Sequence, residues 1–301
     1  MPPFLLSLLP ALLAVLLFVA AIEWLVGWLA ILNSWQQLPV SAQLLALPLL
    51  MASYLLRAWR NYDYFNERAH CHWWRCLYVT VIHNALNSLL PLRSGELSFP
   101  LLMRRHLGLR YRRTVPALLL MRLMDAAVLA LLALLVSSSG HACYWMPLLL
   151  LPLACFPLRA SLLRLLRPWR RARLPRRLIP AITGLPRQFG SYCRCYLLTW
   201  LNWGVKLGLL AWLITSLTGL PVDHAFFGAL GGELTSILPI NPPGGLGSYQ
   251  AGVLAGVMWW QPPSPVLLAA AVNIHLLLLG SSLLAALGAT LIAHGLRHAQ
   301  R

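Results

Sequence analysis

The chain has 301 residues, of which 59% are hydrophobic and 10% are charged, and its mean hydropathy is +0.69. Soluble domains carry about 25% charged residues, so this composition excludes a domain that covers its surface with polar side chains. The net charge is +17, from 24 basic and 7 acidic residues. The basic residues stand in short clusters between long apolar runs, which indicates loops on the inner side of a membrane rather than nucleic-acid binding.

Six apolar runs are long enough to cross a bilayer as helices, which takes about 20 residues. We expect the first run to be an uncleaved span, because it lacks a preceding basic region and continues past the length of a signal peptide. The second run is followed by a basic stretch that contains Arg57 and Arg60, which we expect in the cytoplasm. The six predicted spans cover residues 4–29, 40–56, 115–136, 144–163, 196–217 and 266–293.

Two further apolar segments are interrupted near their middles. Residues 77–103 are broken at 91–96 and lie between two basic clusters, whereas residues 225–260 are broken at 239–247 and have flanks without Lys or Arg. A segment whose two ends lie on one side of the membrane must enter and return. The sequence therefore predicts two re-entrant hairpins, one entering from the cytoplasm and one from outside. Eight simple spans with proline kinks are the alternative.

The predicted fold class is all-α, a polytopic transmembrane bundle of about six full spans and two oppositely oriented re-entrant hairpins. We expect a single integral membrane domain over residues 1–301, with a basic cytoplasmic loop at about 164–194. Hairpins of opposite orientation suggest an inverted repeat with a site near the midplane. The expected location is the bacterial inner (plasma) membrane, with both termini in the cytoplasm.

Charged residues inside the apolar segments are the candidate binding residues, because a charge within a bilayer is costly and usually functional. Arg93 and Glu96 stand at the first break, where helix ends leave backbone donors, and Arg93 suits a phosphate. Arg122 and Asp125 are three residues apart on one helix face and can pair, so a purely structural ion pair is the alternative there. Glu233 lies in the first arm of the second hairpin.

No cofactor or metal is expected. A group of two His and two Cys between residues 70 and 76 is compatible with a metal site, but the neighbouring Trp73 and Trp74 favour a membrane-interface segment. The nucleotide-binding pattern G-x-x-x-x-G-K-[ST] does not occur. No nucleophile motif supports catalysis, so we expect no enzyme activity.

Three motifs resemble elements of the lysylphosphatidylglycerol synthase transmembrane-region family, which is also described as flippase-like. They are PLRSGE at 91–96 followed by Arg104 and Arg105, RLMD at 122–125, and LPINPPGGLG at 238–247. The motifs occur in the family's order, and the resemblance covers about residues 75 to 295. The chain departs from the family pattern at three positions, where the family often has Arg, Glu and Glu: Phe99, Met121 and Gln250.

The resemblance implies a stand-alone membrane member, without the synthase domain, that moves a lipid or lipid-linked molecule between leaflets. Arg93 and Arg122 would then bind the headgroup phosphate, while Glu96 and Asp125 balance charge when the site is empty. Two more polar residues complete the expected binding site: Glu233 and Asn241. The second break would form a flexible gate, with these residues: Pro242, Pro243, Gly244, Gly245 and Gly247.

The expected partners are the membrane and an anionic phospholipid or lipid-linked substrate, with no nucleic acid. An alternative function is a non-transporting membrane partner of a lipid or envelope-polysaccharide synthesis enzyme, such as a glycosyltransferase or synthase. A membrane-embedded transferase is a third hypothesis.

Overall fold

Every regular element in the described part of the chain is a helix. The computed structural model describes residues 16–36, 38–69, 71–137, 147, 150–154, 156–166, 168, 179, 182, 184–186, 188–235 and 242–298. Within a bilayer the backbone has no water to bond, so an apolar run satisfies its N–H and C=O groups internally by forming a helix. The all-α prediction is confirmed.

Four long helices are candidate membrane spans: α3 (Val40–Ala69), α6 (Tyr111–Ser137), α11 (Phe189–Thr218) and α14 (Pro265–His298). Among the residues described, these are the helices long and apolar enough to cross a membrane by themselves. At 1.5 Å per residue, the 27 residues of α6 extend about 40 Å, which matches a bilayer with its headgroups. The chain is therefore a multi-pass membrane protein.

The first predicted span, residues 4–29, is bent where we expected a straight helix. In its described part, a helix at residues 16–25 meets α2 (Trp28–Gln36) at 71°. Gly27 lies at the bend with φ of 83°, a conformation open to glycine. The carboxylate of Glu23 then accepts a hydrogen bond of 2.9 Å from the backbone N–H of Trp28, which caps the start of α2.

The second span is much longer than predicted. We expected it to end at residue 56 and Arg60 to lie in a cytoplasmic loop, but α3 continues to Ala69 and buries Arg60, which is 4% exposed. An acidic side chain of α6, described below, compensates the buried charge of Arg60. α11 begins at Phe189, within the range predicted for the basic loop at 164–194.

The span predicted at 144–163 is not one continuous helix. In its described part, α8 (Leu151–Ala154) and α9 (Arg159–Leu166) are separated by a turn at 156–158. Pro157 lies in that turn, and proline lacks the N–H that a continuing helix needs. None of the residues of α9 is buried.

The chain forms two compact units, each assembled from separate stretches of sequence. The first unit consists of Met1–Met51, Asn84–Glu96 and Val205–Arg301, and the second of Ala52–His83 and Leu97–Gly204. The broken tip of the first hairpin therefore belongs to the same unit as the second hairpin.

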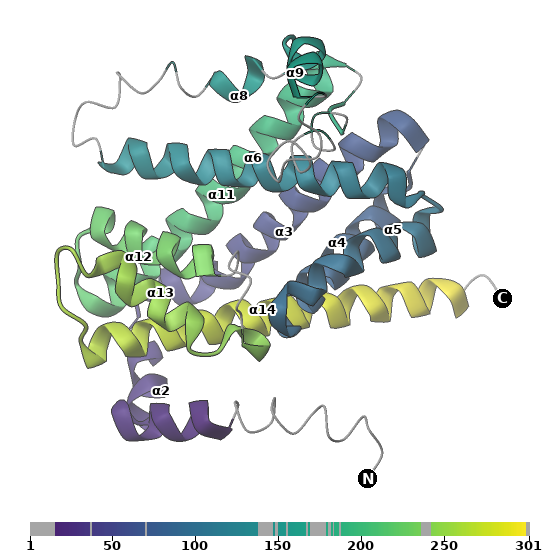
Figure 1. Ribbon diagram of the computed structural model, residues 1–301. Coiled ribbons are helices and arrows are strands. Elements are labelled where there is room, and N and C mark those ends of the chain that lie inside the picture. Colours follow the sequence, from purple (N-terminus) through teal and green to yellow (C-terminus); the bar gives the residue numbers. More distant parts are fainter. Residues whose placement is uncertain are drawn as a thin grey trace. The chain divides into compact units, whose positions relative to one another are not determined.

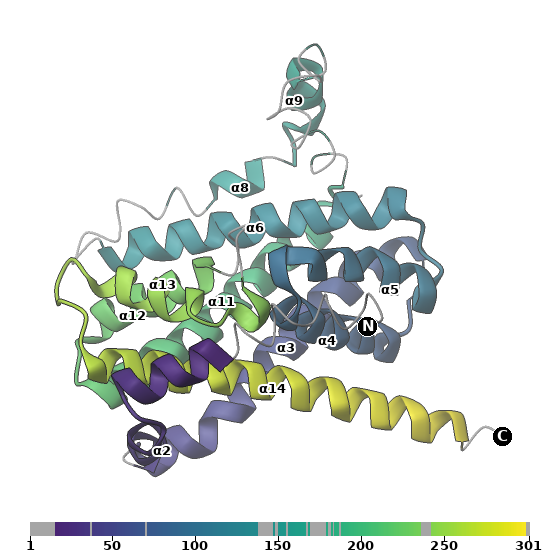
Figure 2. The same ribbon diagram turned by 60° about the horizontal axis from the view of Figure 1, so that its bottom comes forward.

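In the first unit, the second hairpin is a tightly packed helix pair. Figures 1 and 2 show α12 (Val222–Thr235) and α13 (Ser248–Val257) side by side against α14. A Cβ atom added at Gly231 would lie 2.1 Å from the carbonyl oxygen of Gly252, so these two helices approach at backbone distance. The predicted break at 239–247 does separate two helices.

The segment predicted as the first hairpin, residues 77–103, is also broken where predicted. α4 (Trp73–Leu89) is followed by a 3₁₀ segment, η1 (Pro91–Leu97), and by α5 (Ser98–Leu107). In the first unit, η1 turns back onto the end of α4, where a Cβ atom added at Gly95 would lie 2.4 Å from Cα of Asn87. In the second unit, α5 packs on α6.

Candidate substrate site

The predicted pair of Arg122 and Asp125 lies deep in α6. Asp125 follows Tyr111, the first residue of α6, by 14 residues, which places it about 21 Å along the helix axis. Its carboxylate is therefore near the middle of a span that crosses about 30 Å of hydrocarbon. A charge at this depth needs partners from neighbouring helices.

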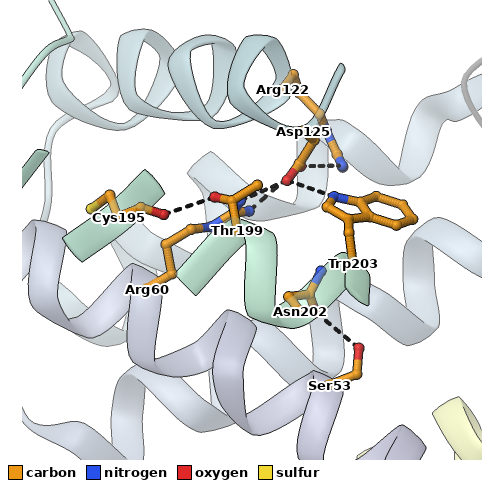
Figure 3. Close-up of polar contacts among 8 residues, drawn as sticks. All are labelled: Ser53, Arg60, Arg122, Asp125, Cys195, Thr199, Asn202 and Trp203. Carbon is orange, nitrogen blue, oxygen red and sulfur yellow. Dashed lines mark hydrogen bonds and ion pairs between the residues drawn. The ribbon is translucent and has the colours of Figure 1, made fainter. Parts of the chain in front are cut away.

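The closest partner of Asp125 is Arg60 of α3. One guanidinium nitrogen of Arg60 lies 2.6 Å from Oδ1 of Asp125, and the same nitrogen donates to the hydroxyl of Thr199 on α11 at 2.9 Å. The indole N–H of Trp203 donates to Oδ1 of Asp125 at 3.1 Å (Figure 3). Both ionised side chains are buried, with 5% of Arg60 and 4% of Asp125 exposed.

These contacts tie together α3, α6 and α11. The Thr199 hydroxyl donates a hydrogen bond to the carbonyl of Cys195, and the Ser53 hydroxyl donates to the side-chain oxygen of Asn202 at 2.8 Å (Figure 3). A buried ion pair is tolerated when further hydrogen bonds satisfy both partners. Asp125 is therefore linked to two neighbouring helices, and Arg60 rather than Arg122 is its nearer ionic partner.

Two further arginines lie around the carboxylate of Asp125. A guanidinium nitrogen of Arg122 lies 3.7 Å from Oδ2 of Asp125, and the guanidinium of Arg57 lies 5.9 Å from the ring centre of Trp203. Arg57 and Arg122 both act electrostatically on Asp125. Three arginines thus surround the carboxylate of Asp125. The side chain of Arg122 is 30% exposed and Arg57 is half-buried, so an anion can approach them.

Glu233 has a partner that the sequence did not suggest. Its carboxylate lies 2.7 Å from Nζ of Lys206, and both side chains are largely buried in the first unit. The pair joins α12 to α11 and neutralises both charges. Glu233 is therefore an ion-pair partner within its own unit.

The glycines among the predicted gate residues have positive φ angles, which glycine adopts without strain. Gly244, Gly245 and Gly247 have φ of 68°, 68° and 81°. Pro243–Gly245 form one 3₁₀ turn, η2, which Pro242 precedes in extended conformation. Asn241 lies outside the described residues. The second break is therefore a glycine-dependent turn leading into α13.

Arg93 and Glu96 lie in η1, at the tip of the first hairpin. The backbone of Arg93 is part of this 3₁₀ segment, and its side chain falls outside the described atoms. Glu96 is half-buried. The structure brings Arg122 and Asp125 together and places Arg93 and Glu96 in the unit that also contains Glu233.

The three departures from the family pattern are all buried side chains. Phe99, Met121 and Gln250 are 1%, 3% and 2% exposed. Gln250 bonds through its amide nitrogen to the ring of His275 at 3.0 Å and accepts the N–H of Gly247 at 2.9 Å. Gln250 therefore has a hydrogen-bonding role at the start of α13 that needs no charge.

Sequence reasoning missed two basic residues of these sites, Arg60 and Lys206. Buried positions on α3 recur every three or four residues beyond residue 56, at Ala58, Asn61 and Phe65. That helical period was the available signal for Arg60. Lys206 is a lone cation within an apolar run, which is the same signal that identified Arg122.

The arrangement is suited to binding an anion rather than to covalent chemistry. Arginines form bidentate hydrogen bonds with phosphate oxygens, and a low local dielectric strengthens the attraction. Among the residues that the structure describes, no three His, Cys, Asp or Glu side chains are grouped to hold a metal ion.

Comparison with known proteins gives one family. The family model described as lysylphosphatidylglycerol synthase TM region matches residues 8–288. This range includes α3, α6 and α11 with the arginine cluster, as well as both hairpins. A search of curated proteins finds no match.

Proposed function

The chain belongs to the lysylphosphatidylglycerol synthase transmembrane-region family, and from this premise we propose that it is a flippase-like translocase. Its substrate would be an anionic phospholipid or a lipid-linked intermediate of the bacterial inner membrane. In this proposal it is not an enzyme. The observation that carries the proposal is the grouping of three arginines around Asp125, near the middle of α6.

A headgroup phosphate would bring negative charge to the three arginines around Asp125. The guanidinium of Arg122, whose side chain is 30% exposed, would hold a phosphodiester oxygen. Asp125 keeps Arg60 in place throughout, because their contact of 2.6 Å is buried. A lipid crossing the membrane would thus meet a cationic site at the depth where its charge is most costly.

The remaining spans follow the predicted topology in this proposal. Six full spans and two oppositely oriented re-entrant hairpins would form one domain with both termini in the cytoplasm. Support comes from the first unit, which groups the tip of the first hairpin with the whole of the second. Arg93 would bind a headgroup phosphate at that tip, and the glycines at 244–247 would let the second hairpin open.

A second candidate function is a non-transporting partner of a lipid or envelope-polysaccharide synthesis enzyme. The specific observation in its favour is that Arg60–Asp125 and Lys206–Glu233 are short, buried ion pairs. Such pairs hold helices together and need no substrate. A glycosyltransferase or synthase would then be the companion protein.

The test is lipid translocation in proteoliposomes that contain the purified full chain. Fluorescent phosphatidylglycerol, its aminoacyl form, a polyprenyl phosphate and zwitterionic phosphatidylcholine are compared. We expect one anionic lipid to move, and its rate to fall at least tenfold in Arg122→Gln and in Arg93→Ala. The matched control is Arg164→Gln, an exposed arginine of α9, which should keep the wild-type rate.

Thermal unfolding of every variant in detergent separates lost transport from lost folding. If folded wild-type protein moves none of the four lipids, the translocase proposal fails and the partner function takes its place. If transport persists unchanged in both site variants, the arginine cluster is not the binding site.

A further inference from the structure

A second arginine cluster lines a surface pocket at the turn between α5 and α6. The pocket has a volume of about 350 Å³, and its lining is Arg104, Gly108, Arg110, Tyr111 and Arg112. Three of these five residues are arginines and none is acidic. The pocket is therefore strongly cationic, and it lies apart in sequence from the cluster around Asp125.

The turn geometry fixes this arrangement. α5 ends at Gly108, whose φ of 69° lets its N–H bond back to the carbonyls of Arg104 and Met103. The chain then reverses, and α6 begins at Tyr111. The guanidinium of Arg104 lies 4.9 Å from the ring centre of Tyr111 and is oriented by it. A Cβ atom added at Gly108 would meet nothing within 4 Å, so glycine leaves the pocket open.

The pocket stands at headgroup depth. It adjoins the first residue of α6, whose length of about 40 Å brings each end into the headgroup layer. Tyrosine and arginine are both typical of this boundary. The positive end of the α6 dipole also points into the turn.

Exposed apolar side chains flank the arginines. Leu101 on α5 is 55% exposed and Val115 on α6 is 41% exposed, each within about one turn of a pocket residue. A phosphate in the pocket would thus have hydrocarbon-binding surface directly beside it. The acyl chains of a phospholipid can contact that apolar surface, whereas a free phosphate ion has no apolar part.

We propose that this pocket binds the phosphate of an anionic phospholipid headgroup as a resident lipid site. Arg104, Arg110 and Arg112 hold the phosphate, and Leu101 and Val115 contact the acyl chains. The lipid stays in one leaflet and anchors the α5–α6 turn. This site does not depend on the translocase proposal, because it lies at the membrane surface.

The test counts lipids bound to the purified full chain by native mass spectrometry. Phosphatidylglycerol is titrated against wild type, against the pocket variant Arg104→Gln/Arg112→Gln, and against Arg105→Gln/Arg113→Gln. The last pair is matched in charge and sequence position, and both of its arginines are exposed without lining the pocket. We expect the pocket variant to lose at least tenfold in affinity and the matched control less than twofold.

Three comparisons separate the sources of binding. Equal losses in the two double variants would overturn the proposal, because they would indicate general attraction to surface charge. Equal binding of phosphatidylcholine would also overturn it. Inorganic phosphate that competes as strongly as glycerophospholipid would show an ion site rather than a lipid site.

The single variant Arg122→Gln distinguishes this pocket from the candidate substrate site. Phosphatidylglycerol binding should remain at the wild-type level in Arg122→Gln, even if that variant no longer transports. If the tenfold loss appears in Arg122→Gln and not in the pocket variant, the resident-lipid site is refuted while the translocase proposal survives.

Discussion

Asp125 accepts hydrogen bonds from two helices and faces three arginines, so its charge organises the second unit. Replacing it with asparagine leaves the buried guanidinium of Arg60 without a countercharge. We expect Asp125→Asn to lower the free energy of unfolding by about 3–5 kcal/mol. Equilibrium unfolding in mixed detergent micelles measures this loss.

The matched control is Asp63→Asn, which removes the same charge from an outer ion pair. Asp63 pairs with Arg194 at 3.0 Å, but the side chain of Arg194 is 57% exposed. Water compensates that arginine, so the expected loss is about 0–1 kcal/mol. If the two substitutions lowered the free energy of unfolding by similar amounts, Asp125 would not be what holds the three helices together. The double variant Arg60→Gln/Asp125→Asn should recover part of the stability, since it buries no uncompensated charge.

The pairing of Arg122 with Asp125 was predictable from the sequence, and the pairing of Arg60 with Asp125 was not, for a physical reason. A charge inside an apolar run is conspicuous because the bilayer makes it costly. Arg60 instead follows an apolar run, where positive residues ordinarily mark a cytoplasmic loop. Its partner is 65 residues away in the sequence. A pairing that distant depends on tertiary packing, which residue spacing along one helix does not encode.

At the scale of elements, the α12–α13 pair depends on glycine at the helix contact. A Cβ atom at Gly231 would meet the carbonyl oxygen of Gly252 at 2.1 Å, so the helices must separate to admit it. We expect Gly231→Ala to lower stability by about 1–3 kcal/mol, as overpacking does. Thermal unfolding in detergent gives the comparison with wild type.

Gly280 is the matched control for that substitution, because it also lies inside a long helix, α14. A Cβ atom there meets nothing within 4 Å. Gly280→Ala should leave stability unchanged or raise it by up to about 1 kcal/mol, since alanine favours a helix. Should Gly231→Ala prove as harmless as Gly280→Ala, the close approach of α12 and α13 is not required.

The breaks in the two hairpins were predictable and the bend of the first helix was not. Pro91 and Gly95 at one break, and three prolines with three glycines at the other, are strong helix terminators. Gly27 is a single glycine in an apolar run, and glycine is common in transmembrane helices. Its bend is fixed by Glu23, which caps the N–H of Trp28 across the break. This local hydrogen bond gives no periodic signal.

At the scale of the whole molecule, the positive-inside pattern predicts on which side each hairpin begins and ends. Positive residues flank α4 and α5, whereas the flanks of α12 and α13 lack Lys and Arg. Both ends of the first hairpin should therefore be cytoplasmic, and both ends of the second external. This topology determines whether Arg93 reaches the substrate from within the membrane.

Single-cysteine labelling tests the topology, in a background whose six cysteines are replaced by alanine. The positions are exposed ones: Trp74 and Arg105 for the first hairpin, Val222 and Pro263 for the second. A membrane-impermeant maleimide should modify Trp74→Cys and Arg105→Cys only in inverted vesicles. It should modify Val222→Cys and Pro263→Cys only in spheroplasts.

A full span supplies the internal reference for these measurements. Arg112 and Ser137 are exposed residues near the two ends of α6. Cysteines at these two positions must react from opposite sides, because α6 is long and apolar enough to cross the membrane. If positions 74 and 105 also react from opposite sides, α4 and α5 form a single kinked span. The tip with Arg93 would then be an interior kink, and the proposed entry of the first hairpin from the cytoplasm would be wrong.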